Sequence, residues 1–133
     1  MLLKYSFGFF VILLSACFGR PIEETVQGSK MKVIVVQHDS ISDQEVAEMT
    51  NKIEEASVRL FDEFNLSESE VFHVHVWKNY TDFLDAQEEI AGMRIEGSAG
   101  YVFGPNDLAI FYDERYIENA EHEFVHGASL HLN

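Results

Sequence analysis

The pattern of apolar and polar positions predicts four strands. The segment 31–38, "MKVIVVQH", is apolar at nearly every position, which is typical of a strand in the middle of a sheet. The segment 71–77, "VFHVHVW", alternates so that its histidines share one face. Two short apolar runs, 101–103 and 108–112, flank the turn-forming tetrad 104–107. This arrangement predicts a hairpin late in the chain.

Three other segments show the spacing of three and four residues that marks a helix. Ser42 and Glu45 form a capping-box sequence, and the apolar stripe after them predicts a helix of about six turns. A shorter helix, capped by Asn79 or Thr81, is predicted to run through residue 90. A third helix is predicted over 114–132. The order β-α-β-α-β-β-α indicates an α+β fold with a mixed sheet.

The first nineteen residues, "MLLKYSFGFFVILLSACFG", have the features of an export signal. Lys4 precedes an apolar run that is too short for a confident membrane span. The run ends in "LSAC", which resembles a bacterial lipobox and makes Cys17, the only cysteine, a candidate for lipidation. We therefore expect an exported bacterial lipoprotein, held at a membrane in the periplasm or on the cell surface. The alternative is an ordinary cleaved signal and a secreted protein.

These features divide the chain into three parts. Residues 1–16 are interpreted as the signal peptide. Residues 17–30, rich in polar residues, glycine and proline, are interpreted as a lipidated N-terminus and a tether. Residues 31–133 remain as one domain, which is long enough to bury a core.

Composition adds two points about the class of protein. The chain has 133 residues, of which 47% are hydrophobic, and a formal net charge of −14. The hydrophobic content excludes a disordered chain. The acidity argues against nucleic acid as a partner, because nucleic-acid binding needs a basic surface.

The strongest chemical signal is His122-Glu123-Phe124-Val125-His126, the pattern H-E-x-x-H, within the third predicted helix. Residues four apart lie one turn above each other, so His122 and His126 point the same way and together can bind Zn²⁺. Glu123 lies about 100° round the helix, where it cannot be a ligand from the same face. It can instead act as the catalytic general base on a water at the metal.

Through this motif, residues from about 31 to the end resemble the N-terminal half of a zincin metallopeptidase domain. The chain is most similar to the gluzincin-like group called the peptidase MA-like family. The resemblance implies that the strand before the active-site helix pairs with an extended peptide substrate. It places residues 97–103 along a cleft, with four substrate-binding candidates: Ser98, Ala99, Gly100 and Tyr101. A glycine-rich loop entering a hairpin is the alternative interpretation of this stretch.

A catalytic zinc usually has three protein ligands, and the motif supplies two. His131 departs from the metzincin spacing, and on a continuous helix it turns toward the buried direction of Phe124. The other candidates are two histidines on one strand and two acids on the motif helix: His73, His75, Glu118 and Glu121. None is placed convincingly. In gluzincins the third ligand is a glutamate on a later helix, so we expect this chain to be an N-terminal fragment.

The sequence therefore predicts a zinc-dependent metallopeptidase that is truncated and has little activity as written. Its partners are a peptide or protein substrate and a membrane, reached through the lipid. The first alternative is a non-catalytic, membrane-anchored binding module derived from a zincin. The second is an ordinary α+β domain in which the motif is a coincidence.

Overall fold

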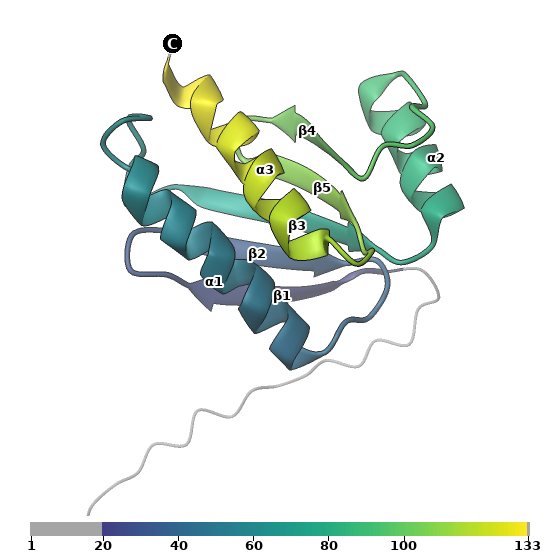
Figure 1. The fold of residues 1–133 in the computed structure, drawn as a ribbon, viewed down its shortest axis with the longest axis horizontal. Helices are drawn as coiled ribbons and strands as arrows, with labels where there is room; N and C mark the ends of the chain where they lie inside the picture. Colours follow the sequence, from purple (N-terminus) through teal and green to yellow (C-terminus); the bar gives the residue numbers. More distant parts are fainter. Residues whose placement is uncertain (1–19, 133) are drawn as a thin grey trace, which may run out of the picture.

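The computed structural model describes residues 20–132 (Figure 1). The predicted signal peptide, the lipobox and Cys17 lie outside these residues. Within the described part, no helix is both long enough and apolar enough to cross a membrane.

The core of the fold is one five-stranded mixed sheet with strand order β1-β2-β3-β5-β4. The three inner strands, β2, β3 and β5, are parallel, and each edge strand pairs antiparallel with its neighbour. This confirms the predicted α+β class, the interior strand over 31–38 and the late hairpin. The strands are β1 Ile22–Gln27, β2 Lys32–Gln37, β3 Val71–Trp77, β4 Gly100–Gly104 and β5 Asp107–Phe111.

The predicted tether over 17–30 is wrong for its second half, because Ile22–Gln27 forms the edge strand β1. Its backbone pairs with β2 along its whole length, and a turn closed by Gly28 N–H donating to Met31 O (2.9 Å) joins the two strands. Only Val26 packs against the core. A strand held mainly by backbone hydrogen bonds leaves little trace in the hydrophobic pattern, and this explains the error.

Three helices complete the domain: α1 Asp43–Leu60, α2 Tyr80–Ala91 and α3 Tyr116–Ser129, which continues as a 3₁₀ turn over Leu130–Leu132. The capping box is confirmed, since the Ser42 hydroxyl accepts from Glu45 N–H (3.2 Å) and the Glu45 carboxylate accepts from Ser42 N–H (2.6 Å). Asn79, one of the two expected caps, accepts from Asp82 N–H (3.0 Å). The first helix is shorter than predicted because the chain turns after Leu60.

The helices lie on opposite faces of the sheet. On one face α1 and α3 pack side by side (Figure 1), with Phe72 and Phe124 in edge-to-face contact at the centre of the main core. On the other face α2 packs its Phe83 against Trp77 and Ala109 in a smaller cluster. The motif helix is thus held between α1 and the edge strand β4.

Candidate metal centre

Helix α3 has one buried face and one exposed face, and the motif histidines lie on the exposed face. The buried residues pack on the sheet and include Ala120, Phe124 and Gly127. Gly127 allows a close approach, since a Cβ there would lie 3.1 Å from Leu108 Cδ2 and 3.2 Å from Pro105 O. The sheet therefore fixes how α3 is rotated, and this rotation leaves His122 and His126 open to solvent.

The two imidazoles converge as the spacing of four residues predicts. Their Nε2 atoms are 3.0 Å apart, and their ring centroids are 4.5 Å apart with planes at 76°. Two nitrogens bound to one tetrahedral Zn²⁺ at about 2.0–2.1 Å would be roughly 3.3 Å apart. His122 and His126 therefore fit a zinc ion with an adjustment of a few tenths of an ångström.

Glu123 leans from α3 toward the start of β4. A Cβ on Gly100 would lie 2.7 Å from Glu123 Cγ and 2.9 Å from Glu123 Oε1, so the side chain occupies space that only a glycine leaves free. Burial raises the pKa of Glu123 above its ordinary value, while the imidazoles of His122 and His126 act to lower it. The candidate base is thus a half-buried carboxyl group beside both histidines.

An open groove of about 650 Å³ runs along the exposed face of α3. Its lining residues all belong to this helix and its N-cap: Arg115, Glu118, Asn119, Glu121, His122, Val125 and His126. Arg115 is a lining residue that the sequence analysis did not identify. The available signal was its position seven residues before His122, which brings it to the same face of the helix.

Two of the other ligand candidates on or after the motif helix, His131 and Glu121, have partners of their own, whereas Glu118 lines the same groove as the histidine pair. His131 Nε2 lies 2.7 Å from Asn106 Oδ1, under the hairpin turn, as its predicted inward direction requires. Glu121 forms ion pairs with Lys52 (3.8 Å) and Arg59 (3.4 Å) of α1. Within residues 20–132, no three His, Cys, Asp or Glu side chains form a group that could hold a metal ion.

The strand histidines also have partners of their own. His73 Nδ1 is 3.4 Å from Asp107 Oδ1. His75 Nδ1 is 3.0 Å from His38 Nε2, and the His38 ring stacks on Trp77 with centroids 3.9 Å apart. Burial, with a smaller contribution from His38, lowers the pKa of His75 to about 4. These residues lie on the sheet face opposite α3 and take no part in the motif site.

The predicted substrate-binding residues, 98–101, lie at or just before the start of β4, and Gly100 lies against Glu123 of the motif. Ala99 O accepts a hydrogen bond from Phe111 N–H (3.0 Å), and the Tyr101 ring packs with Phe83 on the far face. Ser98 donates to Gly100 O (3.2 Å). Gly100 therefore has a second role, which is to make room for Glu123.

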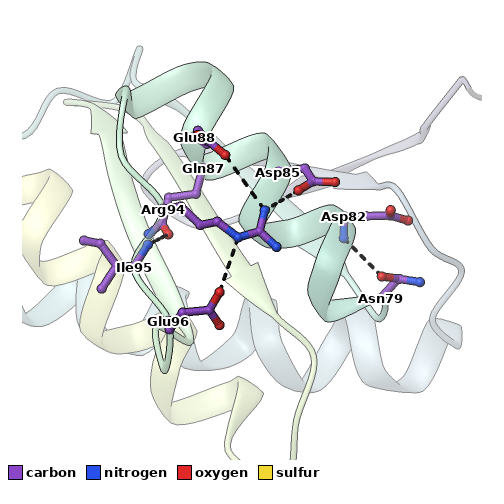
Figure 2. A network of polar contacts seen from close by, with 8 residues as sticks. All are labelled: Asn79, Asp82, Asp85, Gln87, Glu88, Arg94, Ile95 and Glu96. Atoms are coloured by element: carbon purple, nitrogen blue, oxygen red, sulfur yellow. Dashed lines mark hydrogen bonds and ion pairs between the residues drawn. The ribbon is translucent and has the colours of Figure 1, made fainter.

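The loop before β4 is tied to α2 by polar contacts (Figure 2). The Gln87 side chain, 1% exposed, accepts from Ile95 N–H (2.8 Å) and donates to Ser98 Oγ (3.1 Å). Arg94 contacts three carboxylates, those of Asp85, Glu88 and Glu96. Gln87 thus fixes the loop that leads into the strand on which Glu123 rests.

Comparisons with known proteins identified no related protein. No protein-family model matches the chain, and neither the curated proteins nor the solved structures contain a match. The fold and the site together define an α+β domain with a solvent-facing histidine pair on its last helix. The resemblance to zincins expected from the H-E-x-x-H motif is therefore neither supported nor contradicted by these comparisons.

Proposed function

We propose that this chain carries the zinc-binding helix of a metallopeptidase. The observation that supports this most directly is the convergence of the two Nε2 atoms, 3.0 Å apart, at an open groove. Glu123 lies beside them and is partly buried, which suits a general base with a raised pKa. His122 and His126 would hold Zn²⁺. The third protein ligand of such a site would come from outside residues 20–132.

A bound zinc ion would polarise the substrate carbonyl and acidify a water molecule. In the reaction, Glu123 accepts the proton of the attacking water on a carboxylate oxygen and later delivers it to the leaving amine. Burial helps the first step, because a raised pKa makes the carboxylate a stronger base. Gly100 leaves free the space that the Glu123 side chain occupies.

The edge strand β4 is a suitable surface for an extended peptide. Its sequence, "GYVFG", has no charged residue, whereas the opposite edge strand, "IEETVQ", carries Glu23 and Glu24. Charges discourage another strand from pairing with an edge, so only β4 is left open for it. Phe111 N–H donates to Ala99 O (3.0 Å), and hydrogen-bonded pairs alternate along an antiparallel ladder, so Val102 directs its backbone groups outward. Pairing through the backbone would bind peptides of many sequences.

We further propose that the protein is exported and anchored to a membrane through a lipid on Cys17. This proposal rests on the lipobox-like "LSAC". Palmitate labelling of the protein in bacteria, compared between wild type and Cys17→Ser, tests it. Equal labelling of both would refute the anchor.

The peptidase proposal is tested with the full gene product. Wild type is expected to bind one zinc ion and to cleave an unstructured peptide, and His122→Ala is expected to lose both properties. Glu123→Gln should keep zinc and lose cleavage, because an amide cannot accept the proton. Glu89→Gln, an equal change on an exposed glutamate of α2 that lies outside the groove, is the control. Full activity in Glu123→Gln would remove the proposed base.

A second candidate is a non-catalytic zinc-binding module. The specific observation in its favour is that residues 20–132 offer no third ligand beside the two histidines. This candidate predicts zinc binding that depends on His122, without zinc-dependent cleavage of any peptide. The same four proteins therefore separate the two functions.

A further inference from the structure

Arg115 occupies a distinctive position in the groove. It is the N-cap residue of α3, and it is the only lysine or arginine among the lining residues. Elsewhere in the described chain, Arg59 and Arg94 are paired with carboxylates, whereas Arg115, like Arg20, takes part in no ion pair. Of these two arginines, only Arg115 lines the groove. Its side chain also makes no capping hydrogen bond. In a protein with a net charge of −14, an uncommitted guanidinium in the groove needs an explanation.

Helix geometry places Arg115 on the same face as the histidine pair. It precedes His122 by seven residues, and seven steps of 100° return to within about 20° of the starting direction. The same seven residues span about 10 Å along the axis. The guanidinium thus lies at the far end of the groove, toward the N-terminus of α3.

The direction of a bound peptide follows from the contacts of β4. Its first residue, Gly100, lies against Glu123, and Pro105, just after its end, lies against Gly127. Strand β4 therefore runs in the same direction as α3, as Figure 1 also shows. A peptide that pairs antiparallel with β4, the more stable arrangement, runs the opposite way. Its C-terminal end then approaches Arg115.

We propose that Arg115 binds a carboxylate of the substrate two or three residues beyond the cleaved bond. This inference rests on the proposed peptidase function. An extended peptide advances about 3.3 Å per residue, so three residues cover the distance of about 10 Å. Guanidinium and carboxylate match in shape and form paired hydrogen bonds. Glu118, in the groove three residues after Arg115, repels a carboxylate placed nearer to the histidines.

Two sources supply such a carboxylate: the end of the peptide or an acidic side chain. Binding is measured by fluorescence anisotropy on the zinc-loaded Glu123→Gln full gene product, which is not expected to cleave. Three dye-labelled peptides of one sequence serve as probes. The first ends in a free carboxylate, the second in an amide, and the third in an aspartate whose C-terminus is amidated.

We expect the peptide with a free carboxylate to bind about tenfold more tightly than its amide. Arg115→Gln should reduce this ratio of affinities to about one. The substitution removes no capping hydrogen bond from α3, because the Arg115 side chain makes none. Arg20→Gln, the same change at another exposed arginine, should leave the ratio unchanged. Recovery of binding by the aspartate peptide would identify a side chain as the second source of the carboxylate.

Two results would overturn the role proposed for Arg115, and only the second would also overturn the peptidase proposal. Equal binding of carboxylate and amide peptides, still lost on zinc removal, overturns the role of Arg115 and leaves the peptidase proposal standing. Failure of all three peptides to bind, with or without zinc, overturns both.

Discussion

Replacing Gly100 with alanine tests the contact that positions Glu123. The new Cβ would lie 2.7 Å from Glu123 Cγ, whereas ordinary contacts begin at 3.4 Å, so one partner must move by 3.4 − 2.7 = 0.7 Å. The strand is held to β5 by backbone hydrogen bonds, whereas the glutamate side chain can move by rotation about its own single bonds. We therefore expect Glu123 to swing toward solvent and β4 to stay in place.

Two measurements follow from this displacement. Because burial raises the pKa of Glu123, a swing toward solvent should lower that pKa toward its ordinary range. A ¹³C NMR titration of the glutamate carboxyl groups, without zinc, detects this independently of catalysis. Peptide cleavage should fall about 100-fold, since a misplacement of about 1 Å has effects of that size.

The control is Gly104→Ala in the same strand, where a Cβ meets Asp107 Oδ2 at 2.8 Å and leaves Glu123 untouched. Both variants should keep the melting temperature within a few degrees of wild type. An unchanged Glu123 pKa in Gly100→Ala, together with unchanged cleavage, would refute the proposed positioning.

Three further predictions concern the domain itself. The pKa of His75 falls from 6.5 to about 4 on folding, so the unfolded chain binds more protons between these values, and stability is lost as pH drops from 6.5 toward 4. After discounting for the partly exposed ring, we expect the free energy of unfolding of the wild type to fall by about 1–2 kcal/mol over this pH range. His75→Gln should not show this fall. Urea unfolding, followed by the fluorescence of Trp77, measures both. Gln87→Leu leaves Ile95 N–H without its partner and should cost about 1–3 kcal/mol, with faster hydrogen exchange at that amide; unchanged exchange would contradict the role of the loop contact. His131→Ala should cost about 1 kcal/mol and leave zinc affinity as it is, so a loss of affinity in calorimetry would make this residue a ligand after all.

Local patterns in the sequence were enough to predict most of the fold. The capping box at Ser42, the cap at Asn79 and the turn over 104–107 each depend on neighbours in the chain, and the structure contains all three. Strand β1 was missed because its pairing with β2 uses backbone groups, and its side chains carry little apolar pattern. Backbone pairing between segments leaves no such local signal.

In the candidate site, too, local contacts could be predicted from the sequence and contacts between distant segments could not. The approach of His122 to His126 follows from a spacing of four residues, so the sequence alone predicted it. The contact between Glu123 and Gly100 joins positions 23 residues apart, and nothing local to either residue indicates it. Whether Arg115 forms an ion pair likewise depends on which carboxylates the fold brings near each cation. The sequence could therefore predict the convergence of the two histidines but not the contact that positions Glu123.

The pairing of β1 with β2 limits how far the domain can reach from a bilayer. The sheet begins at Ile22, only five residues after Cys17. Fully stretched, five residues span about 17 Å, less than the width of a small domain. Were Cys17 acylated, the domain would lie close to the lipid headgroups, because only a short linker would separate it from the lipid. It would then meet peptides in the thin layer next to the membrane, and freely diffusing ones would have to come to that layer.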